Sequence, residues 1–319
     1  MCDTIIQGGQ YKGSPSIVLE NECIRAEILP GRGAKIASLI LKEPGGRSLE
    51  SLWQIPGERY GYIPAYGDAF GAEDGSGFDD MCPTIAPYTP KTGAWKGVPF
   101  PDHGEVWALS WECSVEKEAL RCSVTGIRAP YRLTRTVRLA GSSLKIDYSL
   151  KNLSTFTLPF QWAAHAIFRA SEGSALMIPK GMNEIINAFD GKRLSGFGKK
   201  YSFPYPDGPT GSSLQIIPGP EARDCQKYWF SFPVSEGWCG LKNTESGLET
   251  MMRFDPEKTP YLGIWINAGG WNNSFNVGLE PSTSIMDDPE TAERYNGASF
   301  LDPGEKKVWG IEIQLSPPV

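Results

Sequence analysis

The chain has 319 residues, of which 40% are hydrophobic, and a formal net charge of −6. This length and hydrophobic content suffice for a full core and exclude a disordered or fibrous chain. An acidic chain without a run of Lys or Arg also lacks the basic patch that nucleic acids and anionic membranes require. We therefore expect neither partner, and a small neutral ligand is compatible with the charge.

The N-terminus and the cysteines bear on the cellular compartment. Residues 1–7 lack the basic and apolar regions of a signal peptide, and no apolar run is long enough to span a bilayer. We expect a cytoplasmic protein. The seven cysteines are scattered and never spaced as CxxC, which indicates neither a disulfide framework nor a zinc site, so we expect buried free thiols.

Short segments in which apolar and polar residues alternate are typical of half-buried antiparallel strands, and the clearest are residues 23–29, 133–139 and 144–150. Residues 138–144 join two of them through a short Gly-containing turn, which predicts a hairpin. Further strands are expected at residues 228–234, 237–241, 261–267 and 308–315. Because so many antiparallel strands avoid open edges by closing into packed sheets, the sequence predicts an all-β sandwich, which we take as one domain over residues 1–319.

Helices should be few and short, because no long segment has a helical period. The best candidate is residues 288–295, with Pro289 at the first helical position. The Gly- and Pro-rich, aromatic segment 57–101 is long for a connection within a β-domain, and such segments are usually functional loops.

Only two histidines occur, and they are the natural acid/base groups near neutral pH. His103 lies in a loop-like approach to a strand. His165 lies on a predicted strand that points it to the side of Ala163, away from Ala164. Glu280 ends an apolar run just before Pro281, which we expect to stop that strand. Each residue also has a structural interpretation: an exposed loop histidine, a buried histidine with satisfied hydrogen bonds, and a salt-bridged edge glutamate.

The order and spacing of several short motifs resemble the aldose 1-epimerase (galactose mutarotase-like) superfamily over nearly the whole chain. The matching segments are ILPGRGAKIASL at 28–39, GFDDMCPT at 77–84, DHGEVW at 102–107, His165, LEPST at 279–283 and LDPGE at 301–305. The resemblance implies an antiparallel β-supersandwich with few short helices. It also implies an isomerase that interconverts the α- and β-anomers of a sugar by opening the ring at C1, without a cofactor or metal.

The resemblance also assigns roles to residues. Glu280 would be the base that takes the proton of the C1 hydroxyl, and His165 the acid that protonates the ring oxygen. His103 would hold the ring oxygen or a neighbouring hydroxyl. The candidates for substrate binding are Arg32, Asp80, Glu105, Trp107, Trp162 and Phe78, with Trp53 as a further aromatic that could stack on a sugar.

Three matters stay open. Ala164 stands where well-known mutarotases carry Asn, which favours a less characterised relative acting on an uncommon aldose, a modified sugar or an oligosaccharide end. The same fold also serves carbohydrate-binding proteins without turnover, and lyases or glycoside-active enzymes, for which Asp79, Asp80 or Glu105 would supply a second carboxylate. The oligomeric state is open as well, a homodimer included.

Overall fold

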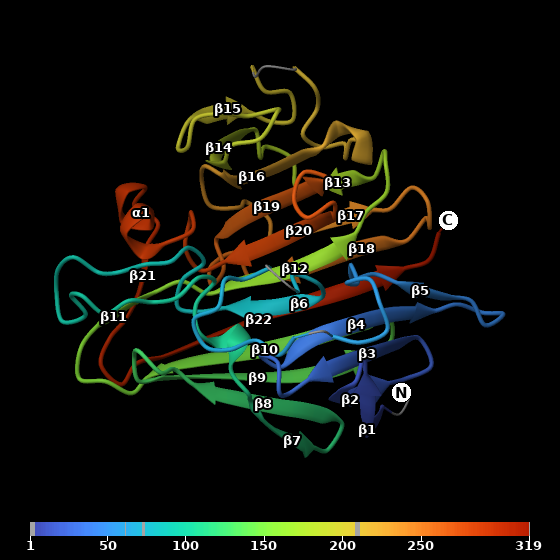
Figure 1. Ribbon diagram of the computed structural model, residues 1–319, viewed down its shortest axis with the longest axis horizontal. Helices are drawn as coiled ribbons and strands as arrows, with labels where there is room; N and C mark the ends of the chain where they lie inside the picture. The colour runs from blue at the N-terminus through green and yellow to red at the C-terminus, as the bar shows by residue number, and fades with distance from the viewer. Residues whose placement is uncertain (1–3, 61, 72–73, 208–210, 319) are drawn as a thin grey trace.

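A computed structural model describes residues 4–60, 62–71, 74–207 and 211–318. The larger of its sheets has twelve strands (Figure 1). They lie in the order β1 (Ile5–Tyr11), β2 (Ser14–Glu20), β3 (Ile24–Leu29), β4 (Lys35–Lys42), β6 (Phe78–Met81), β12 (Ala163–Arg169), β20 (Phe275–Ser282), β19 (Tyr261–Ala268), β16 (Asp224–Phe230), β14 (Glu184–Phe189) and β15 (Lys200–Ser202), with β5 (Ser48–Glu50) paired to β4.

The second sheet has eight strands, and the paired strands of both sheets are antiparallel. Its order is β13 (Ala175–Met177), β17 (Trp238–Lys242), β18 (Glu249–Phe254), β22 (Lys306–Ser316), β10 (Ser143–Asn152), β9 (Tyr131–Ala140), β8 (Ala119–Thr125) and β7 (Glu112–Glu116). A two-stranded sheet joins β11 (Leu158–Phe160) to β21 (Ser299–Leu301). The described helices are the short 3₁₀ turns η1 (Val106–Ala108) and η2 (Pro220–Ala222) and the α-helix α1 (Pro289–Arg294).

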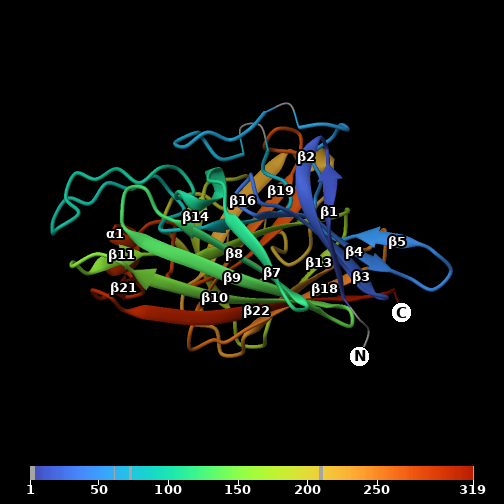
Figure 2. The same ribbon diagram turned by 90° about the horizontal axis from the view of Figure 1, so that it is seen from below.

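The alternation of side chains along the strands decides which face of the large sheet is the core. On β20, Val277 and Leu279 belong to the same apolar cluster as Ile146 of β10 and Ile313 of β22. The residues between them therefore point to the opposite, outer face. Figure 2 shows the layers from the side, with β10 and β22 below, β16 and β19 above, and the light-blue loops of the segment 57–101 beyond the large sheet. The outer face is thus the one that these loops cover.

Several sequence predictions are confirmed. The described chain is almost entirely β, as antiparallel sheets of a sandwich. The predicted hairpin is the β9–β10 pair, whose turn contains Gly141. The predicted helix is α1, in which Pro289 holds the first position and Asp288 caps the N-terminus by accepting a 2.9 Å hydrogen bond from Thr291 N. None of the described helices has the length and apolar character needed to cross a bilayer.

Two strand boundaries were predicted wrongly. The strand expected at residues 228–234 is β16, which begins earlier at Asp224 and ends at Phe230, before Pro233. Pro281 does not stop β20, which continues to Ser282. Pro281 still pairs with Leu262 of β19 on one side. On the other side the pairing with β12 is interrupted between Leu279 and Ser282, where a residue without an N–H costs no ladder hydrogen bond.

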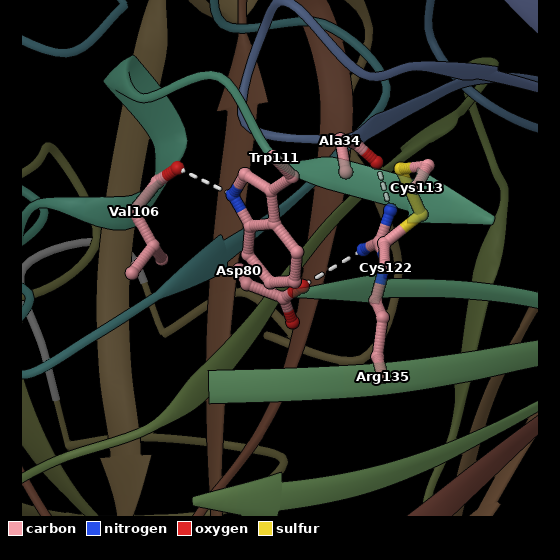
Figure 3. Close-up of a disulfide and its surroundings, with 7 residues drawn as sticks. All are labelled: Ala34, Asp80, Val106, Trp111, Cys113, Cys122 and Arg135. Carbon is pink, nitrogen blue, oxygen red and sulfur yellow. Dashed lines mark hydrogen bonds and ion pairs between the residues drawn. A yellow bond between two sulfur atoms is a disulfide. The ribbon is translucent and has the colours of Figure 1, made fainter. Parts of the chain in front are cut away.

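The expectation that the thiols are free is also wrong for one pair, because Cys113 and Cys122 form a disulfide (Figure 3). The two residues lie directly opposite each other on β7 and β8, with Cα atoms 4.1 Å apart. The other described cysteines are free: Cys23, Cys82, Cys225 and Cys239. Cys2 lies outside the described residues.

Candidate active site

A cavity of about 530 Å³ lies on the outer face of the large sheet. Its floor is built by β12, β16, β19 and β20, and the segment 53–103 supplies most of its walls. Ile85 and Phe70 come from the loop segment predicted to be functional, and Trp53 from just before it. The volume lies within the range of small-molecule sites. His103, His165 and Glu280 all line this one cavity.

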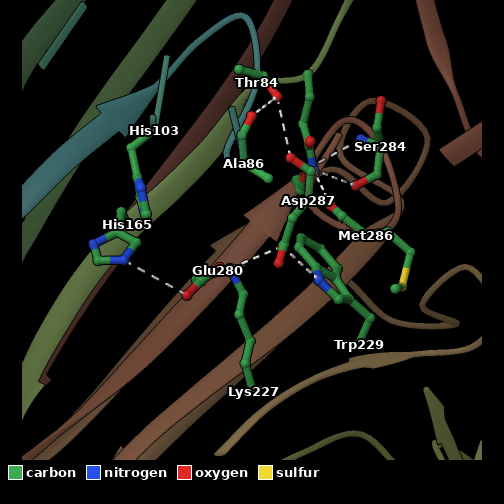
Figure 4. A network of polar contacts seen from close by, with 12 residues as sticks. Thr84, Ala86, His103, His165, Lys227, Trp229, Glu280, Ser284, Met286 and Asp287 are labelled. Carbon is green, nitrogen blue, oxygen red and sulfur yellow. Dashed lines mark hydrogen bonds and ion pairs between the residues drawn. The ribbon is translucent and has the colours of Figure 1, made fainter. Parts of the chain in front are cut away.

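His165 and Glu280 come from neighbouring strands. The core positions Ala164 and Ala166 alternate with His165 on β12, so His165 points to the outer face, on the side opposite Ala164 that the sequence predicted. Its Nε2 lies 3.9 Å from Glu280 Oε1 (Figure 4). A Cβ at Gly278 would lie 3.3 Å from the same oxygen, so the missing side chain leaves room for the carboxylate. Both residues stand where the β12–β20 ladder is interrupted, beside Pro281.

Lys227, which the sequence analysis missed, holds the second oxygen of Glu280. Its Nζ lies 3.0 Å from Glu280 Oε2 and 3.0 Å from Asp287 Oδ1, and Figure 4 shows the chain of contacts. Trp229 Nε1 donates to the same oxygen of Asp287 at 3.0 Å. The Lys227 side chain is only 9% exposed, so its charge acts in a medium that screens it far less than water does. Glu280 is thereby fixed by one oxygen and keeps Oε1 toward His165.

Burial disfavours the charged forms of both Glu280 and His165. Burial raises the pKa of Glu280 above its ordinary 4.5, and the ion pair with Lys227 counteracts only part of this rise. Burial, followed by the neighbouring His103 and Lys227, lowers the pKa of His165 well below its ordinary 6.5. Burial would also lower the pKa of Lys227, but the carboxylates of Asp287 and Glu280 outweigh it and the pKa is raised. The cavity thus contains a charged lysine and a neutral histidine at neutral pH.

The second histidine is held by a carboxylate and an aromatic ring. His103 Nδ1 lies 2.9 Å from Asp102 Oδ1, and Asp102 also accepts a 2.8 Å hydrogen bond from Phe70 N. Burial works against ionisation of Asp102, but the hydrogen bonds from His103 and Phe70 prevail and lower its pKa. An ionised carboxylate can only accept, so Nδ1 carries the hydrogen and Nε2 is left for a ligand.

Phe70 fixes both imidazoles in position. Its ring stacks on His103 with centroids 4.3 Å apart and meets His165 edge-on at 4.8 Å. The two imidazole centroids are 5.4 Å apart. His103 itself adopts a left-handed backbone, with φ of 56°. It is followed by Gly104, where a Cβ would lie 2.2 Å from Cys82 O. The loop is therefore shaped by close backbone packing that places His103 over the cavity.

No family model matches the chain, and no curated protein sequence matches it. Solved structures do match. A protein from Synechocystis sp. PCC 6803 superposes with a TM-score of 0.70 at 18% identity, covering 95% of this chain and 96% of the other. A galactose mutarotase related enzyme from Lactobacillus acidophilus gives a TM-score of 0.66 at 17% identity, with 95% and 98% covered. A galactose mutarotase-like protein from Lactobacillus casei ATCC 334 gives 0.61 at 17%, with 94% and 100% covered.

The chain has the galactose mutarotase-like fold. In this fold the cavity lies on the outer face of the larger sheet, and the three residues predicted to be catalytic meet there. Within the described ranges, no group of three or more His, Cys, Asp and Glu side chains is arranged to hold a metal ion.

The six residues predicted to bind substrate do not line the cavity of this galactose mutarotase-like fold. They are Arg32, Asp80, Glu105, Trp107, Trp162 and Phe78, and all are buried. Asp80 lies between the sheets, where it pairs with Arg135 Nη1 at 2.7 Å (Figure 3) and accepts from Trp162 Nε1 at 3.0 Å. Phe78 and Trp162 belong to the apolar core itself.

The other three of these residues support loops. Glu105 accepts hydrogen bonds from Tyr131 Oη at 2.9 Å and from Arg128 N at 2.7 Å. Arg32 Nε donates to a serine hydroxyl at 3.1 Å, and its guanidinium lies over the ring of Tyr60. Trp107 comes nearest to the site, since its Nε1 donates to Asp102 O at 3.0 Å behind His103.

The second carboxylates weighed for a glycoside-active enzyme are also absent from the described lining. Asp79 forms a buried ion pair with Lys35, and Asp80 and Glu105 are occupied as described above. The carboxylates that do line the cavity are Glu280, Asp102 and Asp287. The last two already hold His103 and Lys227, which leaves Glu280 as the carboxylate that faces His165.

Proposed function

We propose that the protein is an aldose mutarotase, which interconverts the α- and β-anomers of a sugar. The observation that carries this proposal is the distance of 3.9 Å between Glu280 Oε1 and His165 Nε2 at the floor of the cavity. Mutarotation exchanges protons at two oxygens bonded to the same carbon, the C1 hydroxyl and the ring oxygen. A base and an acid this close to each other can each reach one of the two oxygens.

The reaction requires that Glu280 and His165 together carry one proton. Glu280 takes the proton of the C1 hydroxyl, the C1–O5 bond breaks as C1 becomes a carbonyl, and His165 gives a proton to O5. Rotation about C1–C2 followed by closure on the other face of the carbonyl returns both protons. The pKa of Glu280 is raised and that of His165 is lowered, so burial favours the uncharged form of each residue at rest.

The competent form has the proton on His165 and the charge on Glu280. Lys227 supports this form because its ammonium lies 3.0 Å from the Glu280 carboxylate and stabilises the charge there. His103 contributes a second ring nitrogen, with its Nδ1 committed to Asp102. We assign it to a hydrogen bond with O5 or a neighbouring hydroxyl, which positions the ring.

The test is the rate of anomer interconversion over a panel of aldoses, followed by polarimetry and by saturation-transfer NMR. The wild-type protein should accelerate at least one sugar above the buffer rate. Glu280→Gln keeps the shape of the side chain and removes the base, and general-base catalysis contributes about 10²- to 10⁴-fold. We therefore expect a loss of that order with sugar affinity retained.

The same measurement separates the enzyme from a carbohydrate-binding protein. A binding protein would accelerate no aldose, and its affinity would survive Glu280→Gln. Binding without acceleration by the wild-type protein would thus refute the mutarotase proposal.

A further inference from the structure

The floor of the cavity extends well beyond the catalytic pair. The register places Glu280 opposite Gly263, then Gly278 opposite Trp265, then Asn276 opposite Asn267. Asn276 lies four positions before Glu280 on β20, which corresponds to about 13 Å of strand. Asn276, Asn267 and Trp265 all line the cavity, so the floor is longer than one sugar ring.

The end of the cavity remote from Glu280 is walled by aromatic side chains that are accessible to solvent. Trp271 is 45% exposed and Phe189 is 38% exposed. The Phe189 ring lies edge-on to Trp265 at 5.8 Å and to Trp271 at 6.4 Å between centroids. Large aromatic surfaces left open in a cavity indicate binding rather than packing. We call these three residues the outer platform.

The turn between β19 and β20 holds Trp271 in place. The Asn267 side chain bonds the backbone of Trp271 in both directions, donating to its O at 2.9 Å and accepting from its N at 3.1 Å. Ser274 N donates to Trp271 O at 2.9 Å and closes the turn. The exposed tryptophan therefore stands on a rigid support, which reduces the entropy lost when a ligand stacks on it.

The polar groups beside the platform are neutral. Asn276 is 4% exposed, and its Oδ1 has no hydrogen-bond partner in the protein although it lines the cavity. A buried acceptor of this kind needs a donor, which a sugar hydroxyl supplies. The described lining at this end, Phe189, Trp265, Asn267, Trp271, Ser274 and Asn276, is uncharged. Lys227 pairs with Phe189 and Trp265 in the sheet, but its ammonium is directed to Glu280 and Asp287. A phosphate or carboxylate on the ligand would find no cationic partner there.

We propose that the outer platform is a subsite for the second unit of a neutral oligosaccharide, whose reducing end lies against Glu280 and His165. This proposal rests on the proposed mutarotase function and names its substrate class. The free C1 of the reducing sugar meets the acid and base, and the next sugar stacks an apolar face on Trp271 and Phe189. Its hydroxyls bond Asn276.

The test compares glucose with maltose, cellobiose and lactose, which all carry glucose at the reducing end. We expect a higher kcat/KM for at least one of these disaccharides than for glucose. Trp271→Ala should lower the ratio of disaccharide to glucose kcat/KM about tenfold, mainly through KM, because it removes the stacking surface. Trp238→Ala removes a tryptophan that lies outside the cavity and should leave the ratio unchanged.

Calorimetric binding of the same sugars to Glu280→Gln, with and without Trp271→Ala, separates the two proposals. Tighter binding of a disaccharide that depends on Trp271 supports the subsite even if no sugar is turned over, in which case only the mutarotase proposal fails. Turnover of glucose and the disaccharides at equal kcat/KM, with no selective effect of Trp271→Ala, overturns the subsite and leaves the mutarotase standing. If the panel shows neither turnover nor binding of any sugar, the subsite proposal is overturned together with the mutarotase proposal.

Discussion

Replacing Lys227 by Met removes a buried charge that we expect to hold Glu280 in its ionised form. The side chain lies 3.0 Å from carboxylate oxygens of both Glu280 and Asp287, and it is 9% exposed. Methionine has nearly the same length and no charge. The Lys227→Met substitution therefore tests the electrostatic role while it keeps most of the packing.

The magnitude follows from the distance. At 3.0 Å and an effective dielectric constant of about 20, each ion pair of Lys227 is worth roughly 5 kcal/mol before the cost of burying the charges. Breaking a buried pair by removing one partner costs about 3–5 kcal/mol of stability. A carboxyl group without its cation escapes part of this cost by taking up a proton. Glu280 then loses its function as a base.

Two measurements should change together. The kcat/KM for mutarotation near neutral pH should fall by about 100-fold or more, and the acid limb of its pH profile should move to higher pH because the pKa of Glu280 rises further. The stability lost relative to wild type should be largest near neutral pH. It should shrink as the pH falls and Glu280 becomes protonated in both proteins, because the lost attraction exists only while the carboxylate is charged.

Arg193→Met is the matched control. Arg193 is buried and pairs at 2.8 Å with Asp224, which lies on the same strand as Lys227. Neither Arg193 nor Asp224 lines the cavity. This variant should lose stability while it keeps the wild-type pH profile. A folded Lys227→Met protein with an unchanged profile, or an equal shift in Arg193→Met, would refute the electrostatic role of Lys227.

Two further predictions concern the protons of the site. The wild-type rate should peak on the acid side of neutrality. Glu280, the base, needs a pH above its pKa, which is raised from 4.5, and His165, the acid, needs a pH below its pKa, which is lowered from 6.5. A buffer-corrected rate that still rises above pH 8 would contradict these two assignments. Asp102→Asn should lower kcat by at least about tenfold with little change in KM, because a charge-assisted hydrogen bond that orients His103 is lost. Polarimetry over a range of sugar concentrations measures both constants. An unchanged kcat would remove Asp102 from the mechanism.

The direction of His165 could be predicted because a strand has a period of two. The small core residues Ala164 and Ala166 flank it, and the structure confirms that they face the core while His165 faces out. The meeting of His165 with Glu280 could not follow from that pattern alone. It depends on β12 and β20 being neighbours although more than 100 residues separate them along the chain.

Lys227 was missed because of a strand boundary. The strand was predicted to begin at residue 228, where the aromatic run starts, so Lys227 fell outside it. In the structure β16 begins at Asp224, and the polar residues occupy rungs of the sheet. A lysine directly before the aromatic run of a predicted strand is the signal that would have identified it.

The predicted binding residues show the opposite error. Arg32, Asp80 and Glu105 are polar residues within family-like motifs, and the same residue types serve ligand binding and buried hydrogen bonding. Only the three-dimensional packing shows that Asp80 pairs with Arg135 between the sheets. The pairing of Cys113 with Cys122 was missed for a related reason, since it follows from the register of β7 and β8, which the sequence analysis did not predict.

The disulfide lies at the exposed edge of the eight-stranded sheet, where it bears on self-association of the protein. β7 is the last strand of the eight-stranded sheet and is mostly exposed, with Val115 56% accessible. Such a strand offers unpaired backbone groups on which a foreign strand can add. The bond between Cys113 and Cys122 ties β7 to β8 near the open end of their ladder, so β7 resists separating from β8 and pairing with strands of other molecules. Reduction of the disulfide would therefore promote self-association through β7, while the cavity on the other sheet keeps its shape.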